Sequence, residues 1–93
     1  MTSSVSHERK VQIRNQFGLH ARPAAEFVKL ANQFKSDIFV KKFDLEVNGK
    51  SIMGMMMLAA ECGVEISVRA AGEDAEDAVN ELVRLVEQGF GET

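Results

Sequence analysis

The residues best suited to chemistry in this chain are His20 and Arg22, which lie two positions apart in the segment GLHARP at residues 18–23. An imidazole nitrogen is a nucleophile that forms covalent intermediates with electrophiles, phosphoryl groups among them. A guanidinium close by presents paired donors to the oxygens of such a group. The pair therefore indicates phosphoryl transfer, with His20 as acceptor and Arg22 stabilising the transferred charge. The same histidine also suits a helix cap or a surface position, and the residue types alone leave that use open.

The segments on either side place His20 at the start of a helix. Residues 11–14 alternate like a strand, and Gly18 suits the turn that follows it. Apolar residues then recur through residues 24–34 at the spacing of one buried helix face, and Pro23 suits the first helical turn. Free N–H groups and the positive end of the helix dipole meet at such a start. This environment binds phosphate and favours the neutral, nucleophilic imidazole.

Ser51 is the second residue with a potential role. It precedes a short apolar segment, residues 52–58, and suits the N-cap of a helix, which is sufficient reason for a serine at this position. A phosphate on Ser51 would also be stabilised by the helix start, and its charge would alter a docking surface near His20. Both uses of Ser51 stay open at this point.

The remaining segments supply the scaffold. Strand-like runs occupy residues 37–42 and 45–48, and residues 64–70 alternate as a half-buried strand. A final helix carries its apolar stripe through residues 75–86 and ends at Gly89. The predicted order is β-α-β-β-α-β-α, an α+β fold. Because each helix has one apolar stripe and each strand one apolar face, we expect helices packed on one side of a sheet.

The length of the chain and its single cysteine limit the number of domains and disulfides that it can form. Ninety-three residues, of which 45% are hydrophobic, suit one small domain with a single core. We expect a disordered N-terminal tail at residues 1–7 and a single domain at residues 8–93. Cys62 is the only cysteine, so no disulfide forms within the chain, which fits a reducing cytosol. We expect Cys62 to be buried or half-buried, as a small apolar residue.

Several classes of function are disfavoured by composition. A net charge of −3 argues against a dedicated nucleic-acid binder. No apolar run reaches about 18 residues, so no membrane span is expected, and the N-terminus lacks the pattern of a secretory signal. No His, Cys and carboxylate cluster stands at ligand spacing, so no metal site is expected. These features predict a cytoplasmic protein without nucleic-acid, membrane or metal partners.

Two motifs carry a resemblance to a known family. The segment GLHARPA at residues 18–24 resembles the active-site signature of HPr, the histidine-containing phosphocarrier of the bacterial phosphoenolpyruvate-dependent phosphotransferase system. NGKSIMG at residues 48–54 is similar to that family's regulatory serine region, and residues 72–75 are similar to the start of its closing helix. The resemblance spans residues 8 to 91. It implies an open-faced β-sandwich, a four-stranded antiparallel sheet covered on one face by three helices.

The resemblance also implies a function. His20 would accept a phosphoryl group from phosphorylated Enzyme I and pass it to IIA-type domains, with Arg22 holding the phosphoryl oxygens. Ser51 would be phosphorylated by an ATP-dependent HPr kinase/phosphorylase. The protein would then be a monomeric relay for sugar transport and its regulation, needing no cofactor and turning over nothing on its own.

The same resemblance implies an apolar docking patch beside His20. Its expected members are the apolar residues Leu19, Ala21, Ile52, Met53 and Met56. Lys29 belongs to a basic rim that would steer acidic partner surfaces. The methionines of residues 53–57 cannot all face inward from one short helix, so some are expected at the surface, where flexible side chains adapt to several partners.

Two alternative functions stay open. One is the nitrogen-branch phosphocarrier, which uses the same histidine chemistry but supplies regulatory IIA proteins. The other is a regulatory docking module controlled by Ser51 phosphorylation, which the presence of His20 disfavours as the only role. The sequence decides neither the sugar nor the IIA partner.

Overall fold

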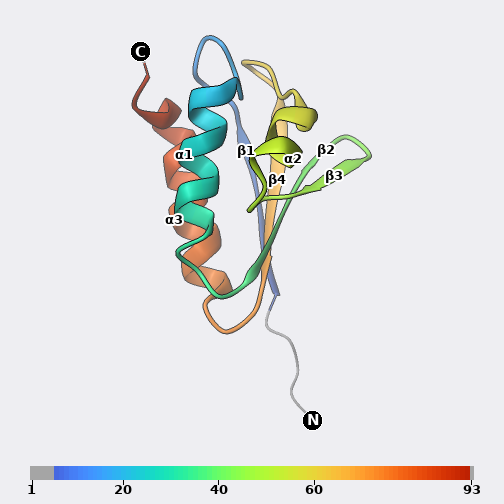
Figure 1. The fold of residues 1–93 in the computed structure, drawn as a ribbon, viewed down its shortest axis with the longest axis vertical. Coiled ribbons are helices and arrows are strands. Elements are labelled where there is room, and N and C mark those ends of the chain that lie inside the picture. The colour runs from blue at the N-terminus through green and yellow to red at the C-terminus, as the bar shows by residue number, and fades with distance from the viewer. Residues whose placement is uncertain (1–5, 93) are drawn as a thin grey trace.

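The computed structural model describes residues 6–92, which form a four-stranded antiparallel sheet and three α-helices (Figure 1). In chain order the elements are β1 (Ser6–Gln12), α1 (Ala21–Ala31), β2 (Asp37–Lys42), β3 (Leu45–Asn48), α2 (Ile52–Leu58), β4 (Glu65–Ala71), α3 (Ala75–Glu87) and a single-turn helix η1 (Gly89–Gly91). The strands are arranged β1-β4-β2-β3, and every neighbouring pair is antiparallel. The predicted fold class and element order are confirmed.

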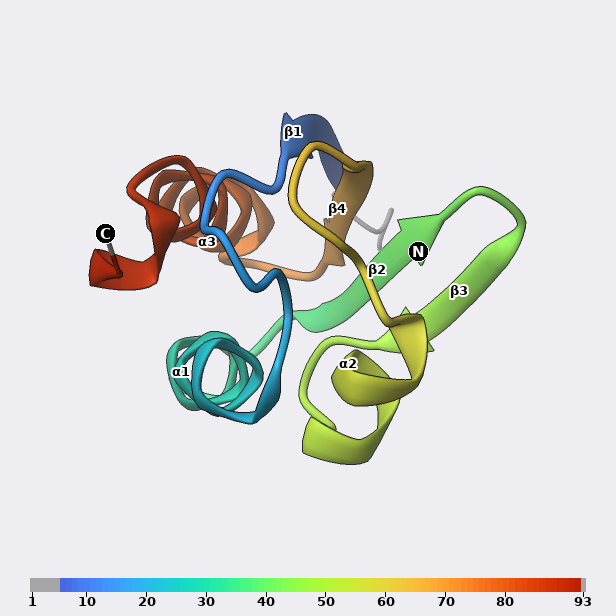
Figure 2. The ribbon, with the colours of Figure 1, turned by 90° about the horizontal axis from the view of Figure 1, so that it is seen from above.

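All three helices cover the same face of the sheet, as the view from above shows (Figure 2). On α1, residues such as Ala24, Phe27 and Ala31 are fully buried, which is the spacing of one helix face. The inward residues of β2 and β4 alternate with exposed or half-buried ones, as a sheet with one open face requires. Burial of each large apolar side chain contributes about 1.5–3 kcal/mol, so this interface provides most of the stability.

The N-terminal strand differs from its prediction. β1 runs from Ser6 to Gln12, and Ser6 and His7 pair with Ala71 and Ala70 of β4, so the expected tail of residues 1–7 is wrong at its last two positions. Residues 1–5 lie outside the described residues. Only Val11 is buried in β1. The predicted alternation at residues 11–14 therefore covers only the end of β1, because backbone pairing rather than an apolar face holds residues 6–10 of this edge strand.

Gly18 fixes the loop that leads from β1 into α1. Its φ of +65° lies in the left-handed region, and a Cβ added there would meet the Ala60 carbonyl oxygen at 2.4 Å. That same carbonyl accepts a hydrogen bond from the Leu19 N–H at 2.9 Å. The loop is therefore held tightly against the segment that follows α2. This contact sets the position of His20, the residue after Leu19.

Asp74 ties the start of α3 to the loop between α1 and β2. Its carboxylate accepts hydrogen bonds from the Ser36 hydroxyl at 2.6 Å and from the Lys35 and Ser36 N–H groups at 2.8 and 2.9 Å. The Ser36 hydroxyl, with help from these N–H groups, lowers the pKa of Asp74 to about 2. The ionised carboxylate thus stabilises the end of the molecule opposite His20.

Two further observations concern predictions made from the sequence, the absence of a membrane span and the burial of Cys62. Within residues 6–92, no helix has both the length and the apolar content to cross a membrane. Cys62 is exposed, so its expected burial is wrong, because it lies in the surface loop before β4.

Candidate functional site

His20 is the N-cap of α1, as the sequence predicted. Its backbone is extended, with φ −75° and ψ −175°, and its carbonyl accepts the N–H of Ala24 at 3.0 Å, which begins the helix. The imidazole makes no capping hydrogen bond, and its side chain is 40% exposed. The first turn of α1 contains no acidic residue. The positive end of the helix is therefore free to bind an anion beside the ring.

Glu92 is the nearest charged partner of His20. His20 Nε2 lies 3.1 Å from Oε2 and 3.2 Å from Oε1 of this carboxylate, which follows η1 near the C-terminus. Burial opposes ionisation of Glu92, but hydrogen bonds from Asn15 and His20, together with the charges of His20 and Arg22, hold its pKa below the usual value. With Nε2–H donating to Glu92, the lone pair of the neutral imidazole is on Nδ1.

Asn15 lies behind this pair. It is 3% exposed, and its Nδ2 donates to the Gly18 carbonyl at 2.7 Å and to Glu92 Oε1 at 2.9 Å. Sequence reasoning missed both Asn15 and Glu92, because their contacts join positions 77 residues apart. A lone acidic residue after a glycine-rich helix end is too common to indicate a site.

The surface around His20 is a shallow pocket of about 430 Å³, which Arg22, Gln16, Phe17, Gly91 and Glu92 line with it. The structure thus brings His20 and Arg22 to one surface. Phe17 is 73% exposed and meets the imidazole edge-on, with ring centroids 6.1 Å apart. An exposed imidazole, a guanidinium and a helix start around one pocket are suited to holding a phosphoryl group.

Ser51 is the N-cap of α2, as predicted, and its Oγ accepts the Gly54 N–H at 3.0 Å. It lies near the C-terminal end of α1, where Asn32 donates to the Lys50 carbonyl at 3.3 Å. His20 begins α1, which has 11 residues, so the two sites are separated by about one helix length, roughly 16 Å. The chain after α2 returns to the His20 loop through the contact of Ala60 with Leu19. Helix α2 therefore connects the two sites.

The expected docking patch is only partly exposed. Ile52, Met53 and Met56 are at the surface of α2, whereas Met55 is buried. Ala21 is exposed at the first position of α1. Leu19 is 4% exposed, so its expected place in a surface patch is wrong. Its backbone is bound to Ala60 and its side chain belongs to the core.

Lys29 lies apart from the docking patch. It is exposed in the last turn of α1, where it lines a hollow with Leu30 and with Leu85 of α3. Lys29 therefore faces the side of α1 toward α3, and it follows His20 by nine positions of the chain. It can contribute long-range attraction at this surface, but it does not line the pocket around His20.

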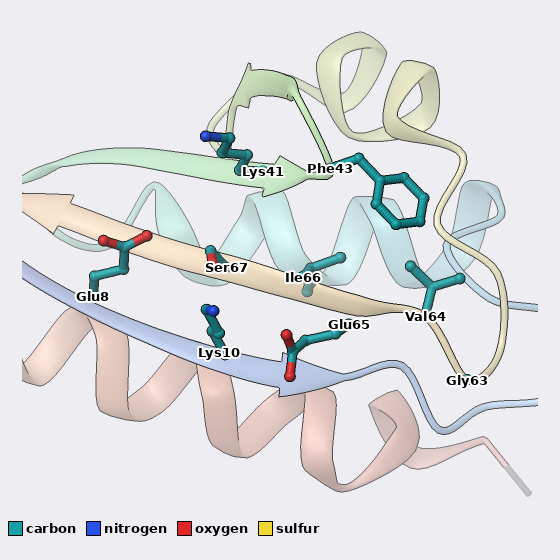
Figure 3. A pocket seen from close by; sticks show the side chains of 9 residues that line it. All are labelled: Glu8, Lys10, Lys41, Phe43, Gly63, Val64, Glu65, Ile66 and Ser67. Atoms are coloured by element: carbon teal, nitrogen blue, oxygen red, sulfur yellow. The ribbon is translucent and has the colours of Figure 1, made fainter.

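A further hollow, of about 610 Å³, lies on the open face of the sheet (Figure 3). Lys10 and Glu8 reach it from β1, Glu65 from β4, and Phe43 from the turn between β2 and β3. Its charges have both signs and it contains no histidine, so it does not share the chemistry of the His20 pocket. Among residues 6–92, no group of at least three His, Cys, Asp or Glu side chains is placed to hold a metal ion.

Comparison with known proteins agrees with this geometry. Residues 7–88 match the family described as the PTS HPr component phosphorylation site. The HPr-like protein Crh of Bacillus subtilis is 47% identical over 81 residues, which cover 87% of this chain and 95% of Crh. The phosphocarrier protein HPr of Neisseria meningitidis is 46% identical over 85 residues, covering 91% of this chain and 96% of that protein.

Solved structures show the same fold. The crystal structure of HPr-C-His from Thermoanaerobacter tengcongensis superposes with a TM-score of 0.90 at 47% identity, covering 94% of this chain and 98% of that one. An HPr dimer from the same organism has also been solved, and the relatives include the phosphocarrier protein NPr of Proteus mirabilis, at 36% identity. Phosphocarriers are relay proteins rather than stand-alone catalysts, and this chain belongs to their HPr family.

Proposed function

We propose that this protein accepts a phosphoryl group on His20 from phosphorylated Enzyme I and passes it to IIA-type domains in the cytoplasm. The observation that supports this most is the placement of an exposed imidazole at the N-terminus of α1, with Nε2 held by Glu92. Membership of the HPr family supports the same role. The fold provides the site with a rigid base, because α1 is anchored to the core by Phe27 and Ala31.

The chemistry follows from the two ring nitrogens of His20. Nε2–H donates to Glu92, so the lone pair on Nδ1 attacks phosphorus while the bond between phosphorus and the donor group breaks. As the new N–P bond forms, positive charge develops on the imidazole and the Glu92 carboxylate stabilises it. The phosphoryl oxygens are held by Arg22 and by free N–H groups at the start of α1. Attack by an acceptor on phosphorus reverses the sequence and restores the neutral imidazole.

Partner docking is proposed for the exposed side of α2. Ile52, Met53 and Met56 form an apolar surface there, and Ala21 lies at the start of α1. Methionine side chains repack at little cost, so one surface can contact Enzyme I and then a different acceptor. Lys29, on the other side of α1, would act by attracting acidic partner surfaces over a longer range.

Regulation is proposed at Ser51, through phosphorylation by an HPr kinase/phosphorylase. The Ser51 oxygen already accepts the Gly54 N–H, so the start of α2 is arranged to receive a phosphate at the same place. The added negative charge would lie at one end of the α2 docking surface, about a helix length from His20. Phosphorylation at Ser51 would therefore weaken docking without altering the reacting nitrogen.

The choice between a sugar branch and a nitrogen branch concerns the partners and not the histidine chemistry. We propose a monomer as the working form. Because an HPr dimer has been solved among the relatives, sedimentation of the purified protein is the appropriate check.

Phosphoryl transfer in a purified system tests the proposal. The protein is incubated with Enzyme I and labelled phosphoenolpyruvate, and His20→Ala is compared with His7→Ala, which removes the other histidine of the chain. Acid-labile label is expected on the native protein and on His7→Ala, and none on His20→Ala. Label on folded His20→Ala, or no label on the folded native protein, would contradict the proposal.

A further inference from the structure

Asn15 is a buried polar residue whose hydrogen bonds are all directed at the His20 site. Its Nδ2 group donates to two acceptors, the Gly18 carbonyl at 2.7 Å and Glu92 Oε1 at 2.9 Å. Its Oδ1 is buried and has no partner among the described residues. An unpaired buried carbonyl costs free energy, so stability alone does not account for an asparagine here.

The direction of the Asn15 amide is fixed by its neighbours. A carbonyl and a carboxylate are both acceptors, so only the NH₂ end of the amide can face them. An aspartate of the same shape would present an acceptor to both, and an alanine would present nothing. Of these three side chains, only the asparagine amide offers two N–H donors, one for Gly18 and one for Glu92.

Asn15 also connects two distant parts of the chain at the active site. Through Gly18 it holds the loop two residues before His20, and through Glu92 it holds the segment after η1. The η1 segment packs closely on it, since a Cβ added to Gly89 would lie 3.8 Å from the Cβ of Asn15. The Glu92 carboxylate is thereby held between two donors, Asn15 Nδ2 and His20 Nε2.

We propose that Asn15 is a positioning residue, which orients the Glu92 carboxylate so that it holds Nε2 of His20 and leaves Nδ1 free to receive the phosphoryl group. The effect on transfer rests on the proposed function. The orientation of the Glu92 carboxylate does not rest on the proposed function, because it is a property of the unphosphorylated protein. Each therefore has its own test.

The first test follows the Glu92 carboxyl carbon by NMR as the pH is varied, with no partner present. The titratable His20 and the charged Arg22 are the groups that act on Glu92 electrostatically, and neither is altered in Asn15→Ala. Loss of the Asn15 donor is expected to raise the pKa of Glu92 toward its ordinary value. The matched control is Gln12→Ala. It also removes a hydrogen bond from a side-chain amide to the backbone, the one that Gln12 Nε2 donates to the Gly63 carbonyl at 2.9 Å.

A structural role for Asn15 predicts a different result in that experiment. The Glu92 titration would then be unchanged in Asn15→Ala, or would move equally in Gln12→Ala, and either outcome overturns the proposal. If Asn15→Ala does not fold, Asn15→Asp keeps the shape of the side chain and replaces a donor by an acceptor. Asn15→Asp is expected to raise the pKa of Glu92 more than Asn15→Ala does, and an unchanged Glu92 titration would contradict the proposal.

The second test is a double-mutant cycle on phosphoryl transfer from Enzyme I. Asn15→Ala and Glu92→Gln are each expected to lower the transfer rate, and Asn15→Ala is expected to leave the KM for Enzyme I unchanged because Asn15 is only 3% exposed. If Asn15 acts through Glu92, the double variant is as slow as Glu92→Gln, to within about twofold. Slowdowns that multiply would show that Asn15 acts independently of Glu92. No transfer to the native protein would defeat the proposed function, while the titration would still decide the positioning role.

Discussion

Substitution of Gly18 by alanine tests how the His20 loop is held in place. The new Cβ would lie 2.4 Å from the Ala60 carbonyl oxygen and 3.0 Å from the Glu61 Cα, both backbone atoms that cannot rotate away. The left-handed φ of +65° costs about 1–2 kcal/mol for a residue with a Cβ. Relief of the overlap costs about 1–3 kcal/mol more. The expected total of about 2–5 kcal/mol is a large share of the stability of a small domain, typically about 5–15 kcal/mol.

Gly63→Ala is the matched control. Gly63 also has a positive φ, +89°, but a Cβ there would meet nothing within 4 Å. Both substitutions therefore incur backbone strain, and only Gly18→Ala incurs the overlap. The overlap of about 1–3 kcal/mol is the expected difference between the two variants. With an m-value of about 1–3 kcal/mol/M, the urea midpoint of Gly18→Ala should be roughly 1 M lower than that of Gly63→Ala. Equal midpoints would refute the reasoning that close packing against Ala60 positions the loop.

Two further predictions concern Ser51 and Asp74. Ser51→Ala should lower the free energy of unfolding by about 1 kcal/mol, measured by thermal denaturation, because the N-cap hydrogen bond from the Gly54 N–H to Ser51 Oγ is lost. Ser51→Asp adds a negative charge at the same place and should slow phosphoryl transfer from Enzyme I. Because the pKa of Asp74 is lowered from 3.8 to about 2, its contribution to stability is complete above about pH 4 and is lost as the pH falls toward about 2. Unfolding measured across that range should depend less on pH in Asp74→Asn, and parallel curves for the two proteins would contradict the role given to its hydrogen bonds.

The parts of the structure that were predictable from sequence depend on local pattern. The apolar stripe of α1 and the position of His20 before it follow from residues close together in the chain, and the structure confirms both. The Ser51 cap was predictable for the same reason. Such features are set by backbone geometry and local hydrogen bonds, which neighbouring residue types reveal.

The parts that were missed depend on tertiary contact. Glu92 reaches His20 only because α3 and η1 return the end of the chain to the start of α1, and no local pattern encodes that meeting. The family resemblance placed Leu19 in a surface patch beside His20, but its backbone is hydrogen-bonded to Ala60 and its side chain is buried in the core. Only the end of β1 was predicted, from the alternation at residues 11–14, because pairing with β4 rather than an apolar pattern holds its charged first part.

The most direct test of the account is to identify the phosphorylated atom. Nitrogen-labelled protein is phosphorylated with Enzyme I and phosphoenolpyruvate, and the imidazole nitrogens of His20 and His7 are followed by NMR. The contact of Nε2 with Glu92 predicts that the N–P bond forms at Nδ1 of His20, with His7 unchanged. A phosphoryl group on Nε2 of His20, or on His7, would contradict it.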